Sequence, residues 1–217
     1  MDERVIPLFP LGALLVPGLI LPLHIFEPRY RRLVQDLLDR PEEERTFGVV
    51  AIREGHEVGA QGARALYEVG TLAFLREATP YDDGRFDIVT VGTERFTLGE
   101  LDESLPYLQA RVRILEEAPG DGADALAAAV ARSFAAYRAL LTDDASTDLP
   151  ADPGVLSYLV AAAVVADLPV RQEFLAAADD ARRLRQEHAF LAREMAVIAA
   201  VPSVPAVELV REPQSPN

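Results

Sequence analysis

The sequence predicts an α+β protein in which a strand-rich half comes first and a helical half follows. Up to about residue 118, apolar residues occur in short β-branched or aromatic runs separated by turn residues, which is typical of strands. Beyond that point they recur every three or four residues, which is typical of packed helices. The change falls at Ala118-Pro119-Gly120-Asp121-Gly122, which we interpret as the boundary between two subdomains.

The first half contains several strand-like runs and one helix. The turn Tyr81-Asp82-Asp83-Gly84 has the Asp-Gly pair of a tight hairpin, where glycine accepts a positive φ. A helix is expected from Pro28, with an apolar stripe formed by Tyr30, Leu33, Val34, Leu37 and Leu38. The expected strands are Leu19–Phe26, Phe47–Ile52, Leu66–Ala78, Arg85–Val91, Arg95–Leu101 and Leu108–Leu115.

The second half is predicted to be a helical bundle that ends in a long helix. Leu126, Val130, Phe134, Tyr137 and Leu141 form the stripe of its first helix. Asp152 before Pro153 predicts the N-cap of the next, and a short helix is expected over Val170–Ala177. The last helix begins near Asp179 and Asp180, with a narrow seam made by Leu184, His188, Leu191, Met195 and Ile198. We divide the chain into a β subdomain (1–118), a helical bundle (121–200) and a flexible Pro-rich tail (201–217).

The composition excludes several classes of function. A net charge of -14 disfavours binding to nucleic acid, because the surface repels phosphates. The chain has no Cys, which removes thiol chemistry and suits a reducing cytoplasm, where we expect the protein. It also has no Lys, so it contains neither a P-loop nor a Ser–Lys dyad. ATP hydrolysis of the P-loop type and peptide cleavage by such a dyad are therefore excluded for this sequence.

The segment from Val5 to Phe26 lacks charged residues and is long enough to imitate a membrane span. Its four prolines would break a helix repeatedly and leave backbone groups unsatisfied in lipid. Asp2 and Glu3 also stand where a signal peptide would be basic. We therefore expect a buried, extended segment of a soluble protein.

The titratable residues form no convincing catalytic or metal site. His24 and Glu27 are close in sequence, but local hydrogen bonding explains them more simply than a shared metal. His56-Glu57 lacks the second histidine of the zinc motif, and His188 lies on an apolar seam. The clusters Arg29/Arg31/Arg32 and Arg182/Arg183/Arg185 are expected to pair with neighbouring acids. No catalytic residue, metal or cofactor is therefore predicted.

The run Leu19–Phe26 is the main candidate for a binding surface. It is hydrophobic in both alternations of a strand, so it is either buried on both faces or leaves one face in a groove for an extended peptide. Burial on both faces is the first expectation. The second interpretation would give the chain a peptide-binding site.

Several motifs of the chain resemble the substrate-binding domain family of Lon proteases, in the form of its stand-alone bacterial members. The resemblance begins with Pro7-Leu8-Phe9-Pro10-Leu11, Leu15-Val16-Pro17-Gly18 and Leu21-Pro22-Leu23-His24-Ile25-Phe26-Glu27-Pro28-Arg29-Tyr30, and its specificity comes from the combination of motifs rather than from any one of them. It continues with Phe47-Gly48-Val49-Val50, Val69-Gly70-Thr71-Leu72-Ala73, Gly92-Thr93-Glu94-Arg95-Phe96 and Asp167-Leu168-Pro169. Together these motifs cover about residues 5 to 200.

The resemblance implies a PUA-like first subdomain, a strongly bent β-sheet or pseudo-barrel with one helix, followed by the helical bundle. It also implies a role in recognising protein substrates. We therefore expect a non-catalytic, cytoplasmic module of protein quality control that binds exposed or unfolded polypeptide, with a protease or chaperone as a further candidate partner. The candidate peptide-binding residues are Leu21, Leu23, His24, Phe26, Glu27, Arg29, Tyr30, Arg95 and Phe96.

Two other functions remain open at this point. PUA-like domains occur in RNA-modifying proteins, so the first subdomain could bind RNA or a nucleotide, although the acidity of the chain argues against it. A small-molecule enzyme could instead have its site at the junction of the subdomains, where clefts commonly form. His24, Glu27, Arg29 and Tyr30 would then be its candidate residues.

Overall fold

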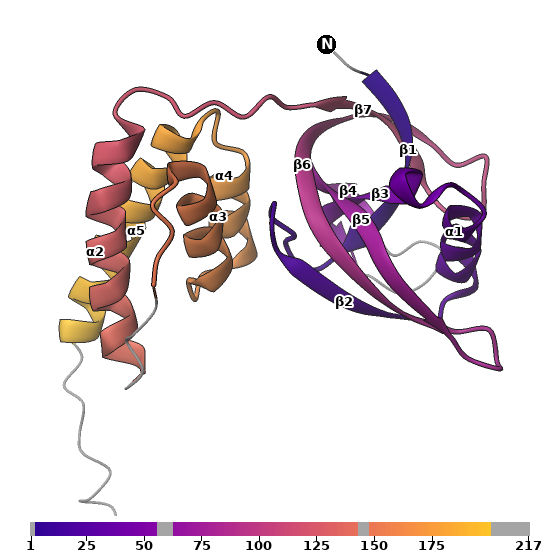
Figure 1. Ribbon diagram of the computed structural model, residues 1–217, viewed down its shortest axis with the longest axis horizontal. Helices are drawn as coiled ribbons and strands as arrows, with labels where there is room; N and C mark the ends of the chain where they lie inside the picture. The colour runs from indigo at the N-terminus through magenta and orange to yellow at the C-terminus, as the bar shows by residue number, and fades with distance from the viewer. Residues whose placement is uncertain (1–2, 56–62, 143–147, 201–217) are drawn as a thin grey trace, which may run out of the picture.

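The computed structural model describes residues 3–55, 63–142 and 148–200, and it places a β subdomain beside a helical subdomain (Figure 1). This α+β arrangement is the one predicted. The β subdomain consists of β1 (Glu3–Leu11), β2 (Ile20–Ile25), α1 (Pro28–Leu38), the 3-10 turn η1 (Glu42–Glu44), β3 (Thr46–Gly55), β4 (Ala63–Leu66), β5 (Val69–Pro80), β6 (Phe86–Asp102) and β7 (Gln109–Ile114). The helical subdomain consists of α2 (Ala123–Leu141), α3 (Pro153–Ala163), α4 (Leu168–Leu175) and α5 (Asp180–Ala200).

The strands form a closed, bent sheet. They are hydrogen-bonded in the order β1-β7-β6-β5-β3, and β1 also pairs with β3 in parallel, which closes the ring. β4 is added to β3, and β2 is added to β6. The predicted pseudo-barrel is therefore confirmed.

The strands differ from the prediction in three main places. β1 is not among the expected strands, although most of it lies in the segment that is expected to be extended. The expected run Leu66–Ala78 is divided, because Tyr67 and Glu68 turn the chain between β4 and β5. The two runs expected over Arg85–Val91 and Arg95–Leu101 form one long strand, β6. Two register shifts bend β6 against β5, so one strand can pair with β2 near its start and with β7 near its end.

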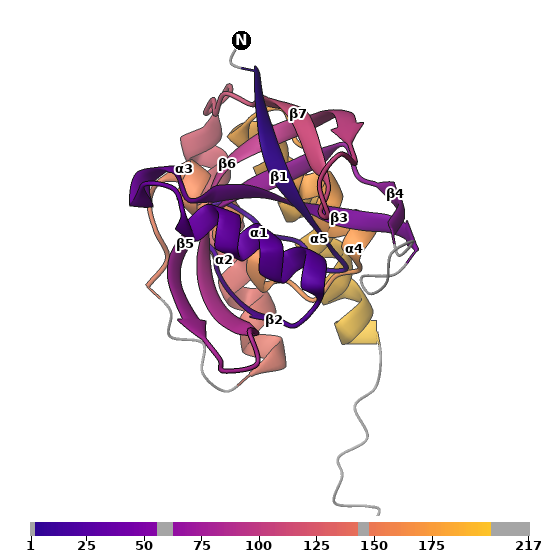
Figure 2. The ribbon, with the colours of Figure 1, turned by 90° about the vertical axis from the view of Figure 1, so that its right-hand side faces the viewer.

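Both faces of the central strands are buried, which explains their continuous apolar sequences. One face fills the barrel with Ile6, Leu8, Val50, Leu72, Phe96, Ala110 and Val112. The other face of β3 places Phe47 and Val49 against Tyr30, Leu33, Val34 and Leu37 of α1. Figure 2 shows that α1 covers the side of the sheet that faces away from the helical subdomain.

The uncharged segment from Val5 to Phe26 folds as β1, a buried stretch that includes Leu14–Val16, and β2. Burial is not complete, since Ile20 is 63% exposed and Phe26 is 50% exposed. The expectation that the run Leu19–Phe26 is covered on both faces is therefore wrong. In β2, which pairs with β6 alone among the described strands, every second residue from Ile20 to His24 is exposed, so one face of the strand is open to solvent. Among the helices of the described residues, none has both the length and the hydropathy that spanning a membrane requires.

The helical subdomain has its own apolar core, which also includes residues of the β subdomain. Val130, Phe134 and Tyr137 of α2 are buried in it, as their spacing predicts, whereas Leu141 is half exposed. The core extends into the β subdomain through Leu14, Val16 and Val69. The side-chain amide of Gln172 also donates to the carbonyl of Val69 at 2.7 Å. The two subdomains are thus packed together over an apolar interface with specific hydrogen bonds.

Backbone hydrogen bonds fix the chain just before β2 against β6. Gly18 N–H donates to the carbonyl of Gly92 at 2.9 Å, and Gly92 N–H donates to the carbonyl of Leu19 at 3.0 Å. A Cβ atom at Gly92 would collide with the carbonyl oxygen of Val16, so this approach requires glycine. Residues 16–19 are thereby held at the edge of the β subdomain that faces the helices.

Candidate functional site

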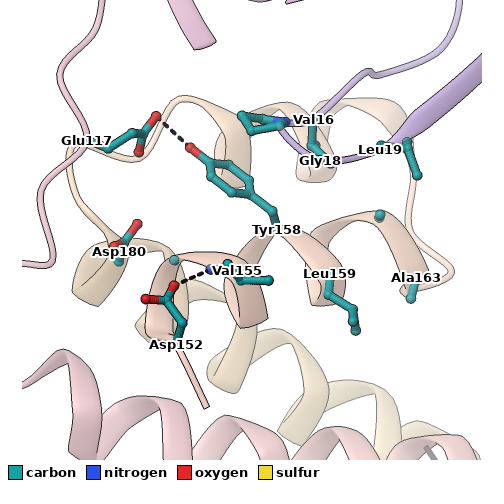
Figure 3. Close-up of a pocket in the computed structure, with 13 residues that line it drawn as sticks. Val16, Gly18, Leu19, Glu117, Asp152, Val155, Tyr158, Leu159, Ala163 and Asp180 are labelled. Carbon is teal, nitrogen blue, oxygen red and sulfur yellow. Dashed lines mark hydrogen bonds between the residues drawn. The ribbon is translucent and has the colours of Figure 1, made fainter. Parts of the chain in front are cut away.

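A cavity of about 760 Å³ lies at the junction of the two subdomains. Its lining comes from four separate parts of the chain, namely the segment before β2, the linker after β7, helix α3 with its N-cap, and the start of α5. Figure 3 shows these residues around the space. The lining residues are Val16, Pro17, Gly18, Leu19, Glu117, Asp152, Gly154, Val155, Tyr158, Leu159, Ala162, Ala163 and Asp180.

Helix α3 provides most of the apolar wall. Its sequence from Pro153 to Ala163 has no charged residue, so apolar side chains remain after one side is packed into the core. Leu156 and Val160 face the core, whereas Val155 is 57% exposed and lines the cavity. Val16 and Leu19 line the cavity from the β subdomain (Figure 3). This apolar surface is open to a ligand.

The opposite end of the cavity is polar and carries Glu117, Asp152, Asp180 and the hydroxyl of Tyr158 (Figure 3). Asp152 is the N-cap of α3, as predicted, and its Oδ1 accepts from Val155 N–H at 2.8 Å. Tyr158 donates to Oε1 of Glu117 at 2.8 Å. A ligand in this cavity would therefore meet an apolar wall at one end and carboxylates at the other.

Two buried arginines lie behind these carboxylates and connect the subdomains. Arg95 of β6 is 1% exposed and donates to both carboxylate oxygens of Glu117, at 2.7 and 3.1 Å. It also donates to the carbonyls of Leu175 and Ala177, at 2.7 and 2.6 Å. Glu117 belongs to the linker between β7 and α2. Arg95 thus joins a strand, the linker and the end of α4.

The second arginine, Arg183 of α5, is fully buried. It donates to Oδ1 of Asp180, to the hydroxyl of Tyr158 and to the hydroxyl of Ser157, each at 2.9 Å. Its guanidinium also lies 3.9 Å from the centre of the Tyr158 ring. This network positions the Tyr158 side chain at the cavity wall.

Burial and the arginines act in opposite directions on the carboxylates. Burial alone would raise the pKa of Glu117, but the hydrogen bonds and charge of Arg95, with Tyr158 and Arg183, outweigh it and hold that pKa below its ordinary value. Burial raises the pKa of Asp180, although Arg183 opposes the change. The pKa of the Tyr158 hydroxyl is also raised, mainly by burial. Tyr158 is therefore a hydrogen-bond donor at neutral pH rather than a base.

Most of the residues predicted to bind peptide lie elsewhere, around a smaller hollow of about 140 Å³ between β2 and the start of α1. Leu23, His24, Phe26, Glu27 and Tyr30 line this hollow. Leu21 is partly buried next to it, and Arg29 pairs with Glu27 at 3.0 Å and lies 4.5 Å from the centre of the Tyr30 ring. The structure thus brings seven of the nine predicted residues to one side of the β subdomain.

The other two predicted residues have a different place. Arg95 is buried in the network described above, and Phe96 is fully buried inside the barrel. Neither side chain is available to a peptide on the surface, because β6 directs one to the subdomain interface and the other to the barrel interior. We therefore remove Arg95 and Phe96 from the candidate peptide-binding residues.

The residues considered for an enzyme at the junction do not lie there. His24 pairs with Asp87 at 2.6 Å and is solvent-exposed, whereas Glu27 and Arg29 pair with each other. Tyr30 is buried against Phe9, with the two ring centres 4.1 Å apart. None of these four residues lines the junction cavity. His24 and Glu27 thus have separate partners.

Sequence reasoning considered a cleft at the junction of the subdomains, but none of the residues it named for that cleft lines the cavity. One signal was available, since α3 has no charged residue on any side and a surface helix normally has a polar face.

The seam predicted for α5 is partly wrong, because Glu187 takes the buried position next to Leu184 and His188 is exposed. The predicted pairing of the arginine clusters is confirmed for Arg29 with Glu27, Arg32 with Asp36 and Arg183 with Asp180.

The relatives of this chain are Lon proteases. Lon protease 2 of Sorangium cellulosum is 30% identical over 208 residues, which cover 91% of this chain and 26% of that protease. Lon protease of Parabacteroides distasonis is 31% identical over 122 residues, or 55% of this chain and 14% of that protease. The chain thus spans about a quarter or less of the length of the curated relatives it matches.

Two solved structures share the fold. The Lon N-terminal domain protein from Xanthomonas campestris superposes with a TM-score of 0.61 at 23% identity, covering 86% of this chain and 98% of that one. The N-terminal domain of the Mycobacterium avium complex Lon protease gives a TM-score of 0.65 at 18% identity, covering 87% and 98%. The sequence profile of the ATP-dependent protease La (LON) substrate-binding domain matches residues 5–193. This chain therefore belongs to the Lon substrate-binding domain family.

Proposed function

We propose that this protein binds exposed or unfolded polypeptide without catalysing a reaction, and that an apolar side chain of the bound segment enters the junction cavity. The observation that carries the proposal is the cavity itself, with Val16, Leu19, Val155 and Leu159 on its apolar wall. A cavity of about 760 Å³ accepts several residues of an extended chain. Membership of a substrate-binding domain family supports the same function.

The chemistry of the cavity supports binding rather than catalysis. Among the described residues, its lining includes no histidine or serine, and its charged side chains are all carboxylates. The hydroxyl of Tyr158 and both oxygens of Glu117 are already engaged in the buried network. No lining residue is therefore arranged as a nucleophile with its base. We infer that the bound polypeptide is passed to a protease or chaperone of the bacterial cytoplasm.

The surface of β2 is the second part of the proposed binding site. Leu19 lines the cavity, and the chain continues directly into β2, where Ile20 is exposed and Leu21 and Leu23 are partly covered. An extended polypeptide anchored in the cavity could continue along β2 towards His24 and Phe26. This arrangement keeps the sequence-based candidates as outer contacts and makes the cavity the anchor.

Replacing Val155 with glutamate is expected to weaken binding about tenfold or more, because a charge would enter the apolar wall. The measurement is fluorescence anisotropy of a labelled short peptide with a central Leu-Val-Leu flanked by Ser, Gly and Gln. Val165→Glu is the matched control, since Val165 is 74% exposed on the same subdomain but does not line the cavity. Equal affinities of the two variants, with both folded by circular dichroism, would contradict the proposed site.

A further inference from the structure

We infer that the junction cavity prefers polypeptide segments in which an arginine or lysine stands beside the apolar anchor. This inference rests on the proposed function and names the chemistry of its ligand. The apolar wall selects the anchor, and the carboxylates at the other end of the same cavity select a cation.

The charged side chains that line the cavity all have the same sign. Glu117, Asp152 and Asp180 are the charged residues in its lining, and all three are carboxylates. The arginines that pair with Glu117 and Asp180 are Arg95 and Arg183, which are 1% and 0% exposed. The guanidinium groups are thus enclosed by protein, and the ligand meets the oxygen side of each pair.

Asp152 carries the least compensated of these charges. Its Oδ1 accepts a backbone N–H, and within the described residues it forms no ion pair. A Cβ atom placed on Gly154 would lie 3.3 Å from Oδ1 of Asp152 and 3.1 Å from Oδ2 of Asp180. The two carboxylates therefore converge above Gly154, at the polar end of the cavity.

A cation bound at this end of the cavity would be attracted by both carboxylates. Burial raises the pKa of Asp180, whereas Arg183 opposes the rise and the nearby Glu117 charge adds to it. Arginine suits the site best, because its planar guanidinium can bond to two carboxylates at once. Since the cavity is open to solvent, we expect a moderate preference.

The test compares three labelled peptides that share the central Leu-Val-Leu and differ in one flanking residue, which is Arg, Gln or Glu. The expected order of affinity is Arg, then Gln, then Glu, with the Arg peptide binding about three to five times more tightly than the Gln peptide at low salt. The difference should shrink at higher ionic strength, where charges are screened.

Asp152→Asn shows whether this preference belongs to the cavity. Asparagine is as good an N-cap as aspartate, so α3 keeps its cap while one charge is removed from the cavity. The preference for the Arg peptide over the Gln peptide is then expected to fall by about half. The control is Asp124→Asn, at an exposed carboxylate in the first turn of α2 that does not line the cavity, which should leave the preference unchanged.

Two outcomes would overturn the inference. Equal loss of preference in Asp152→Asn and Asp124→Asn would assign it to the net charge of -14 rather than to the cavity. Equal affinity for the Arg and Gln peptides would also overturn it, but the proposed function would stand if Val155→Glu still weakened the Gln peptide. Failure of all three peptides to bind would refute the proposed function itself.

Discussion

Replacing Arg183 with methionine is expected to lower the free energy of unfolding by about 3–5 kcal/mol. Methionine fills much of the same space, so the loss comes from polar partners rather than from a large cavity. The variant would leave Asp180, the hydroxyls of Ser157 and Tyr158, and the carbonyl of Phe174 without their donor. Removing one partner of a buried ion pair leaves the other charge uncompensated, which is the costly case.

Arg182→Met is the matched control for this prediction. Arg182 is the neighbouring residue on α5, and its side chain is exposed, so its loss should change the free energy of unfolding by no more than about 0.5 kcal/mol. Urea unfolding followed by circular dichroism and by tyrosine fluorescence would measure both variants and show whether the two subdomains unfold together. A loss of less than about 1 kcal/mol in Arg183→Met would contradict the role assigned to this network.

The sequence was sufficient for the helices and for several of the strands, because these depend on local periodicity. The stripe from Tyr30 to Leu37 predicted α1, and Asp152 with Pro153 predicted the start of α3. The limits of β6 were not predictable in the same way, since its bend depends on register shifts against β5. Periodicity identifies a strand, but the strand's length and curvature are decided by its partners.

The burial of Arg183 and Glu187 shows why the residues around the junction cavity were not predicted. On α5, Glu187 stands three residues after Leu184 and His188 stands four after it, so either could take the next buried position. Histidine is the less polar of the two, so the pattern favours His188, whereas the structure buries Glu187. Arg183 is buried because α3 and α4 pack against this part of α5 and supply its hydrogen-bond partners. The junction cavity likewise needs segments around residues 16–19, 117, 152–163 and 180. No local pattern reports such an assembly.

Glu187 is the least satisfied group of this interior, and replacing it with glutamine is expected to stabilise the protein at neutral and alkaline pH. Glu187 is fully buried, and neither of its carboxylate oxygens has a hydrogen-bond partner within the part of the chain that the structure describes. Burial raises its pKa well above 4.5, with Asp180 adding to the rise and Arg183 opposing it. The native state thus binds this proton more tightly than the unfolded chain, and stability falls as pH rises above about 4.5 towards the native pKa.

Glutamine resembles the protonated carboxyl in shape and carries no titrating proton, so the variant escapes this loss. Because stability falls between the unfolded and the native pKa of Glu187, Glu187→Gln should be more stable than the wild-type protein at pH 8 and almost equal to it near pH 4.5. Urea unfolding at several pH values would measure the difference. Glu173→Gln, at an exposed position of α4, should show no comparable dependence on pH. A gain that is the same at pH 4.5 and pH 8 would mean that glutamine acts through packing, and that the ionisation of Glu187 does not limit the stability of the helical subdomain.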